Sequence, residues 1–164
     1  MLSKAAYMNV IIKADTANVQ AATNIYMGAI DPVKSTEGLV CSLTLQSYAE
    51  SLLPSSEFKG GDVLGLGASP GPLVNLLLLT HWSDAKYDDA ILGNMRTALR
   101  GIDEYATSRG AKIDHVYMNY ASEDQDVVKS YGGKNKSFLR EVSKKYDPEG
   151  LFQKGVPGGR KLFI

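Results

Sequence analysis

The chain has 164 residues, of which 44% are hydrophobic and 22% are charged, the balance of a soluble globular domain with room for a buried core. The 18 Lys and Arg residues offset the 18 Asp and Glu residues, so the zero net charge gives no electrostatic case for nucleic-acid binding. Cys41 stands alone, which excludes an intramolecular disulfide, and neither histidine has a partner at metal-ligand spacing. We therefore expect no metal site.

No membrane or targeting segment is expected either. The longest apolar run, Leu73 to Thr80, is far shorter than the ~20 residues of a membrane-spanning helix. Met1 to Lys4 lead into no apolar signal-peptide core with small cleavage residues. These features favour a cytoplasmic chain without a membrane partner.

The first half of the chain predicts a strand, a helix and a second strand. Residues 7–13 are rich in β-branched and aromatic side chains, as strands are. Asp15 or Thr16 can cap a helix that runs to about Met27. Residues 38–48 alternate, with one face made of Leu39, Cys41, Leu43 and Leu45 and the other of Val40, Ser42, Thr44 and Gln46. The first face should pack inward, and the second can line a pocket or meet water.

Two glycine-rich stretches follow a segment that we expect to be a short helix or loop, Glu50 to Phe58. Gly60-Gly61 and residues 65–72 have the wrong spacing for a dinucleotide fingerprint, and prolines interrupt the helix that such a site needs. We expect an inter-strand loop here. Leu73 to Trp82 is nearly all apolar and predicts a strand in the centre of a sheet.

The second half predicts a long helix, a strand and a final helix. Ser83 or Asp84 can cap a helix over residues 85–108, whose apolar stripe has helical spacing and which Gly110 is placed to end. Residues 112–119 predict a fourth strand. A helix over residues 135–146 should bury Leu139, Val142 and Tyr146, and Asp147-Pro148-Glu149-Gly150 predicts a type I turn.

The order strand–helix–strand–strand–helix–strand indicates the α+β class. We expect a mostly antiparallel sheet of about four strands with helices packed on one face.

The best candidates for a functional site are Tyr117, Asn119, Tyr120 and Tyr131. Tyrosines at this density, interleaved with amides, suit a flat organic ligand, because each offers an apolar ring and a hydroxyl that can donate or accept a proton. The alternative is that they are core aromatics whose hydroxyls reach water. On the residues alone, both readings stay open.

The same stretch resembles the C-terminal signature of the berberine bridge enzyme family, flavin-linked oxidases of the vanillyl-alcohol oxidase type. The pieces that carry the resemblance are Tyr117-Met118-Asn119-Tyr120-Ala121, Ser130-Tyr131-Gly132 and Lys145-Tyr146-Asp147-Pro148 with Phe152. Residues 38–46 and the tail 155–163 are similar to fungal members. The resemblance covers essentially the whole chain, and its C-terminal motif is specific.

The resemblance implies a division of the chain and roles for several residues. Residues 1–114 would be a partial substrate-binding domain and residues 115–164 the flavin-facing C-terminal segment, with the N-terminal FAD-binding domain absent. Tyr117 and Asn119 would approach the FAD cofactor, and Tyr120 would face the substrate as a base. The candidate substrate contacts are Gln46, Asn75 and His81.

Three functions follow as alternatives. The first is a truncated FAD-linked oxidoreductase, or a separately encoded part of one, that oxidises a small organic molecule of secondary metabolism by hydride transfer to the flavin. The second is a cofactor-independent cyclase or isomerase that uses the remaining substrate pocket. The third is a non-catalytic partner that associates with itself or with an FAD-domain protein through an exposed sheet face.

Overall fold

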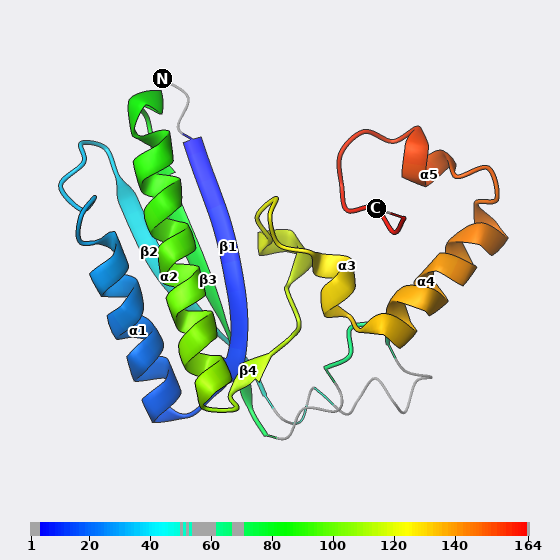
Figure 1. Ribbon diagram of the computed structural model, residues 1–164, viewed down its shortest axis with the longest axis horizontal. Helices are drawn as coiled ribbons and strands as arrows, with labels where there is room; N and C mark the ends of the chain where they lie inside the picture. The colour runs from blue at the N-terminus through cyan, green and yellow to red at the C-terminus, as the bar shows by residue number, and fades with distance from the viewer. Residues whose placement is uncertain (1–3, 50, 52, 54–61, 67–70, 164) are drawn as a thin grey trace.

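The structure is a computed structural model that describes residues 4–49, 51, 53, 62–66 and 71–163 (Figure 1). The elements of its first two thirds are β1 (Lys4–Lys13), α1 (Thr16–Ile30), β2 (Val40–Tyr48), β3 (Leu73–Trp82), the 3-10 turn η3 (Ala85–Tyr87), α2 (Asp88–Ser108) and β4 (Lys112–Ile113). The elements of its last third are the 3-10 turn η4 (Met118–Tyr120), α3 (Val127–Ser130), α4 (Gly133–Tyr146) and α5 (Leu151–Lys154).

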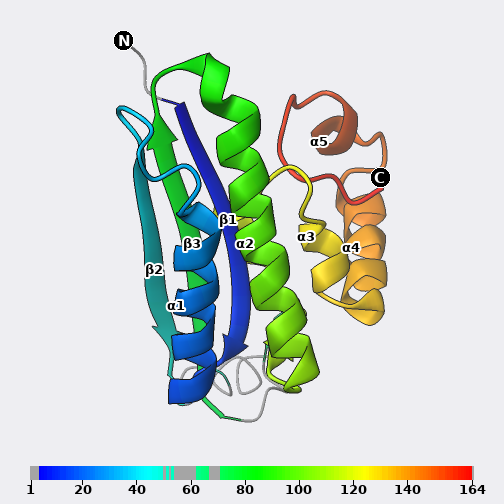
Figure 2. The ribbon, with the colours of Figure 1, turned by 60° about the vertical axis from the view of Figure 1, so that its left-hand side comes forward.

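The four strands form one antiparallel sheet in the order β2-β3-β1-β4. The helices α1 and α2 both cover the same face of this sheet (Figure 2). A β-α-β-β-α-β chain in this order has the ferredoxin-like arrangement. The predicted α+β class, the number of strands and the central position of β3 are confirmed.

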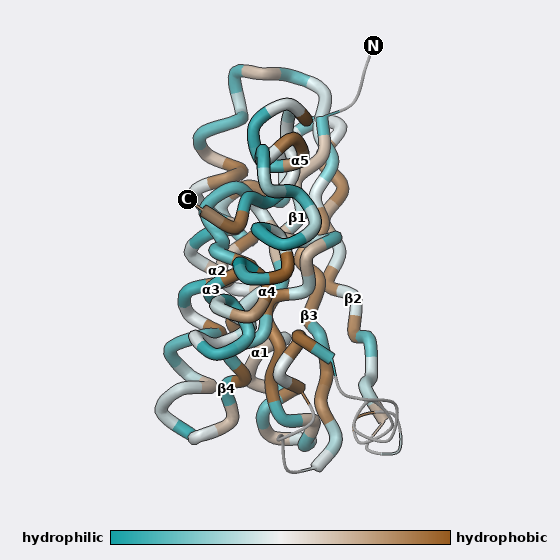
Figure 3. The backbone as a smooth tube through the Cα atoms, turned by 90° about the vertical axis from the view of Figure 1, so that its right-hand side faces the viewer, coloured by the Kyte–Doolittle hydropathy of each residue, from teal (hydrophilic) through white to brown (hydrophobic). Residues whose placement is uncertain are grey.

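The core lies between the two helices and the sheet. It contains alternate residues of the central strands, such as Met8 and Val10 of β1 and Leu76 and Leu78 of β3. Figure 3 shows hydrophobic residues running along β3. The helices contribute buried residues at helical spacing: Ala22 and Tyr26 from α1, and Ile91, Met95, Ala98, Ile102 and Ala106 from α2. Each fully buried aliphatic side chain stabilises the fold by about 1.5–3 kcal/mol.

Local signals set the helix ends as predicted. The Asp15 carboxylate accepts the Asn18 backbone N–H at 2.8 Å and caps α1. Asp84 caps η3, which precedes α2 and makes up the first residues of the predicted helix. Gly110, with φ +60°, ends α2, because the left-handed conformation lets Ala111 N–H reach the Ala106 carbonyl at 2.8 Å.

The predicted strand over residues 112–119 is wrong beyond Ile113. β4 has two residues, and the chain then leaves the edge of β1 and reaches Tyr117 without pairing as a strand. The physical reason is that side chains take the place of the ladder. Asn9 of β1 bonds both backbone groups of Tyr117 through its side chain, and the Gln125 side chain bonds both backbone groups of Asn9.

The last third of the chain packs differently from its prediction. α4 begins at Gly133 and contains no buried residue; Leu139 and Val142 are half-buried, and Tyr146 is 74% exposed. The prediction that α4 buries these three residues is therefore wrong, because α4 lies away from the sheet (Figure 1). The predicted turn is confirmed by the Gly150 N–H, which donates to the Asp147 carbonyl at 3.0 Å.

Two smaller predictions have mixed outcomes. Leu39, Cys41 and Leu43 pack against the core as expected, but Leu45, on the edge strand β2, is 48% exposed. Most of the expected helix or loop over Glu50 to Phe58, Gly60-Gly61 and residues 67–70 of the glycine-rich loop lie outside the described residues. Within the described ranges, no helix combines the length and apolar character needed to cross a membrane.

Candidate functional site

The candidate site lies on the sheet face opposite α1 and α2. Strand alternation puts the odd-numbered residues of β1 and β3 and the even-numbered residues of β2 on this face. Gln46 of β2 lies opposite Asn75 of β3, which lies opposite Ile11 of β1. We call this surface the site face; its other polar and aromatic members are Tyr7, Asn9, Lys13, Ser42, Thr44, Tyr48 and His81.

Three tyrosine rings meet over the site face. The Tyr120 ring stacks on Tyr7 with centroids 6.3 Å apart and an interplanar angle of 10°, and it meets Tyr117 edge-on at 5.0 Å. Both geometries are favourable aromatic pairs. Tyr117 has an extended backbone, and the 3-10 turn η4 follows it directly. This turn brings the Tyr120 ring back against the Tyr117 ring.

A chain of amide hydrogen bonds connects the sheet to Tyr120. Asn75 Nδ2 donates to Gln46 Oε1 at 3.2 Å, and Gln46 Nε2 donates to the Tyr120 hydroxyl oxygen at 3.3 Å. Asn75 is fully buried, and its Oδ1 has no hydrogen-bond partner among the described residues. The structure thus brings together the residue predicted to be catalytic and two of those predicted to contact substrate.

Of the other predicted residues, Tyr117 and Asn119 contact each other and His81 lies apart from them. Asn119 Nδ2 donates to the Tyr117 hydroxyl at 2.8 Å, and Asn119 is exposed. His81 is on the site face, opposite Ala5 and Val40, but its side chain makes no hydrogen bond to any residue that the structure describes. Its position is two residues beyond the level of Tyr7 along β3.

Tyr48 is a member of the cluster that the sequence pattern did not single out. Burial, and to a smaller extent the nearby Tyr117 and Tyr120 hydroxyls, raises the pKa of Tyr48. Three phenols therefore gather at this end of the site face, and Tyr48 stays protonated at neutral pH. Its position at the end of a strand with a polar face was the available signal.

Tyr131, also a candidate from the sequence, lies outside this cluster. Its ring stacks on His115 at 5.3 Å, and burial raises its pKa. His115 is buried, and its Nδ1 donates to the Leu64 carbonyl at 3.0 Å. Burial lowers the pKa of His115, against smaller opposing effects of the Leu64 carbonyl and Asp62. Tyr131 is therefore buried beside His115, outside the tyrosine cluster of the site face.

Asn9 anchors the tyrosine segment, residues 117–120, to the sheet. Its Nδ2 donates to the Tyr117 carbonyl at 3.1 Å, and its Oδ1 accepts the Tyr117 N–H at 2.9 Å. Asn9 is fully buried. The sequence carried one signal for it, a single amide inside the otherwise apolar strand Tyr7-Met8-Asn9-Val10-Ile11-Ile12.

Comparison with known proteins connects this geometry to a family. Residues 116–155 match the family described as "Berberine and berberine like". The chain is 42% identical over 118 residues to the FAD-dependent monooxygenase sdcF of Emericella nidulans, a match that covers 72% of this chain and 25% of that protein. It is 31% identical over 160 residues to the FAD-dependent monooxygenase drtC of Aspergillus calidoustus, covering 95% of this chain and 30% of that protein.

A further relative has a different kind of name. The bifunctional solanapyrone synthase of Alternaria solani is 30% identical over 133 residues, which cover 81% of this chain and 25% of that protein. The chain spans roughly a quarter of the length of the curated relatives that it matches. With the berberine-like match over the tyrosine segment and these fungal relatives over most of its length, this chain is similar to a part of berberine bridge enzyme-like proteins, and two of these relatives are named FAD-dependent monooxygenases.

Proposed function

We propose that this chain forms the substrate-side wall of an FAD-linked oxidoreductase that oxidises a small organic molecule. The observation that carries the proposal is the series of hydrogen bonds from Asn75 to Gln46 and from Gln46 to Tyr120, which holds the Tyr120 phenol at a fixed point on an aromatic surface. The names of the relatives, which include FAD-dependent monooxygenases, support a flavin-dependent reaction.

The residues present fit the ring end of FAD. A flat, conjugated ring with a polar edge is complementary to aromatic side chains and to amide donors and acceptors, and the site face and tyrosine segment offer both. Tyr117 and Asn119 are the residues that would contact the ring. Bound FAD would supply the two-electron acceptor of the reaction. The proposal assigns no residue of this chain to the diphosphate.

Tyr120 would handle the proton of the reaction. Stacking against Tyr7 and edge contact with Tyr117 fix its ring, so its hydroxyl approaches the substrate in one orientation. The N–H that Gln46 donates to the phenol oxygen can stabilise negative charge that develops there when Tyr120 takes part in proton transfer. Asn75 holds Gln46 in the orientation that presents this N–H.

The test separates binding of the cofactor from the proton step. FAD added to the chain should lose fluorescence as its ring stacks on the tyrosines, and Asn119→Ala should weaken this quenching. Tyr120→Phe should leave FAD binding in place and lower the rate of benzyl alcohol oxidation by about 10²–10⁴-fold, the usual contribution of general acid–base catalysis.

The matched control is Tyr105→Phe, which removes a phenol hydroxyl from α2, away from the site face. It should change neither quenching nor rate. Equal rates for wild type and Tyr120→Phe would rule out Tyr120 as the proton-handling residue. Absence of quenching in the wild type would rule out flavin binding by this chain alone.

A cofactor-independent cyclase or isomerase is the second candidate. Two observations favour it: all residues of the Asn75–Gln46–Tyr120 chain belong to this polypeptide, and one relative is named as a bifunctional synthase. Turnover of a polyene substrate without added FAD, lost in Tyr120→Phe, would support this candidate over the oxidoreductase. Association with itself or with an FAD-domain protein stays a prediction.

A further inference from the structure

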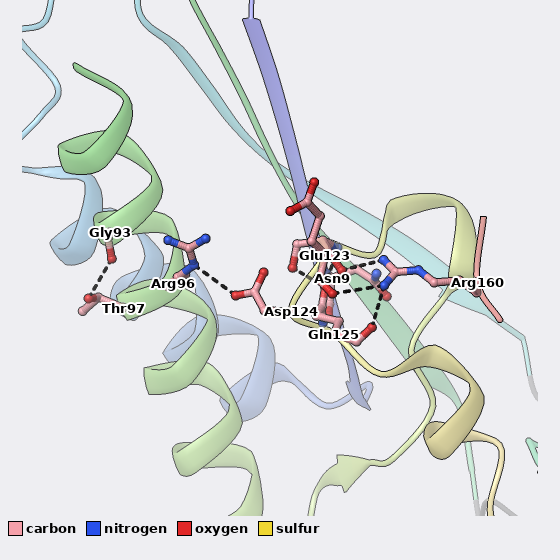
Figure 4. Close-up of polar contacts among 9 residues, drawn as sticks. Asn9, Gly93, Arg96, Thr97, Glu123, Asp124, Gln125 and Arg160 are labelled. Carbon is pink, nitrogen blue, oxygen red and sulfur yellow. Dashed lines mark hydrogen bonds and ion pairs between the residues drawn. The ribbon is translucent and has the colours of Figure 1, made fainter. Parts of the chain in front are cut away.

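Arg160 lies five residues beyond the segment that matches the family, and its side chain returns to the site. Its guanidinium donates to four backbone carbonyls of the loop that follows Tyr120. Figure 4 shows Arg160 beside Glu123 and Gln125, two of these four residues. Nη2 donates to Ala121 at 2.9 Å and to Ser122 at 2.5 Å. Nη1 donates to Glu123 at 3.2 Å and to Gln125 at 3.1 Å.

The tail is built to bring Arg160 to this loop. Gly158 and Gly159 both have positive φ, at 72° and 67°, a conformation that side chains other than glycine rarely adopt. After Arg160, the Leu162 N–H donates to Gln153 Oε1 at 2.9 Å and the Leu162 carbonyl accepts from Arg140 at 2.7 Å. The chain after Arg160 is therefore held by hydrogen bonds at Leu162.

The loop in turn holds the sheet edge. Gln125 Nε2 donates to the Asn9 carbonyl at 2.7 Å, and Gln125 Oε1 accepts from the Asn9 N–H and the Ser122 N–H, both at 3.2 Å. The Asn9 side chain then bonds both backbone groups of Tyr117. The contacts thus run from Arg160 to the loop, to Gln125, to Asn9 and to the tyrosine segment.

We propose that Arg160 is a positioning residue for Tyr120. It touches neither Tyr117 nor Tyr120 itself; it fixes the loop over residues 121–125, and the loop fixes both ends of the tyrosine segment. The catalytic consequence rests on the proposed function, whereas the positioning is a property of the chain alone. Arginine suits the role because its planar fork of five N–H donors can reach several carbonyls at once, which a lysine ammonium cannot.

A second arginine provides the matched control. Arg96 of α2 binds the same loop from the other side, where its Nε lies 3.0 Å from Asp124 Oδ2 (Figure 4). The side chains of Arg96 and Asp124 are both about half exposed, and exposed ion pairs of this kind contribute little to local order. Replacing Arg96 therefore removes one cation from the loop without removing the carbonyl contacts.

The first measurement is amide hydrogen exchange on the full 164-residue chain. The Asn9 and Tyr117 N–H groups are bonded to side chains of the contact series, so they report its opening. Arg160→Met should speed their exchange by at least about tenfold, as a local opening does. Amides between β1 and β3 should keep their rates, and Arg96→Met should change the two reporter rates by less than about twofold.

The second measurement is NMR of ring-labelled tyrosine, with signals assigned by single Tyr→Phe variants. In Arg160→Met the Tyr117 and Tyr120 signals should shift, while those of Tyr26 and Tyr105 stay in place. Unmoved Tyr120 signals, an equal effect of Arg96→Met, or movement of all four tyrosines together would overturn the proposal.

Arg160→Lys keeps the charge without the fork, and it also serves if Arg160→Met fails to fold. It should shift Tyr117 and Tyr120 in the same direction as Arg160→Met, with the other two tyrosines unmoved; wild-type signals would refute the role of the fork. Failure of the oxidoreductase proposal would appear as absent FAD quenching in the wild type, and it would leave these tyrosine signals as they are.

Discussion

At Asn9, two amide side chains make the bonds that backbone groups of a longer β4 would make. Asn9 presents a donor and an acceptor to Tyr117, and Gln125 presents a donor and an acceptor to the backbone of Asn9. Only an amide supplies both functions from one side chain of this size. Buried backbone groups without partners are costly, so these two residues are not interchangeable with aliphatic ones.

Asn9→Ala should lower the free energy of unfolding by about 2–4 kcal/mol, because it leaves the Tyr117 N–H without its partner, removes one of the two hydrogen bonds to the Tyr117 carbonyl and opens a cavity in a fully buried position. Urea unfolding at neutral pH measures the change. Asn24→Ala, at an exposed position of α1, is the control and should cost less than about 0.5 kcal/mol. A loss below about 1 kcal/mol for Asn9→Ala would show that the anchor is dispensable.

At the scale of elements, the contact between α1 and α2 depends on one glycine. A Cβ built at Gly101 of α2 would lie 2.9 Å from Ile25 Cγ2 of α1, closer than atoms of packed side chains approach. Gly93, on the same helix, has no atom within 4 Å of a built Cβ. The two positions share the same helical backbone and differ in whether another helix lies against them.

Gly101→Ala should therefore destabilise the chain by about 1–2 kcal/mol, since the overpacking of the helix contact exceeds the gain in helix propensity. Gly93→Ala should stabilise it by up to about 1 kcal/mol, since only the propensity gain remains. Thermal or urea unfolding of the two variants side by side tests this. A gain in stability for Gly101→Ala would mean that the helices separate at no cost.

Hydrophobic periodicity predicted the helices and strands that pack against apolar side chains. It failed for segments whose structure depends on hydrogen bonds to residues distant in the sequence. The periodicities of β1, α1, β3 and α2 sufficed because burial on one face is all that these elements require. The end of β4 could not be predicted, because it depends on a bond from Asn9 to Tyr117, 108 residues along the chain. Tyr146 has helical spacing but no neighbouring element to cover it, which its own sequence cannot show.

The candidate site was predictable to a similar extent. Tyr117, Asn119 and Tyr120 stood out by density, and strand alternation put Gln46 and Asn75 on the correct face. The role of Tyr7 as the stacking partner of Tyr120 depends on β1 lying beside β3, which only the sheet order reveals. The contacts of Arg160 could not be predicted, because its partners are backbone carbonyls, which carry no sequence information.

For the whole molecule, His115 joins parts that are distant along the chain. It follows β4, stacks on Tyr131 just after α3, and bonds the Leu64 carbonyl in the connection between β2 and β3. Burial lowers the pKa of His115. Its imidazole is therefore protonated less readily in the folded chain than in the unfolded chain, where a histidine has a pKa of about 6.5. The stability that depends on neutral His115 is present above pH ~6.5 and is lost as the pH falls through the lowered value.

The wild type should accordingly be less stable at pH 5.5 than at pH 7.5, and this slope should flatten in His115→Phe, which keeps the ring stack and cannot be protonated. Urea unfolding at the two pH values measures the slope. His81→Gln removes the other histidine and should retain the slope if the effect belongs to His115. An equal slope in wild type and His115→Phe would refute the assignment.

Large exposed apolar residues lie in two parts of the molecule. On the site face Val40 and Tyr7 are exposed, whereas Leu66 is buried against Ile11 and Leu73 and the tyrosines lie over another part of the face. Further large exposed apolar residues lie in the last helices and the tail: Phe138, Tyr146, Leu151, Phe152, Val156 and Phe163.

The Gln125 contact limits how the chain can vary in length. One side chain reaches from the loop to both backbone groups of Asn9, while four carbonyls of the same loop converge on Arg160. An added or deleted residue between Tyr120 and Gln125 would break this geometry from both sides. The connection between α1 and β2, exposed at Lys34 and Ser35, has no such constraint and is the natural place for an inserted peptide. Relatives should therefore vary in length at residues 34–37 and keep a constant count from Tyr117 to Gln125.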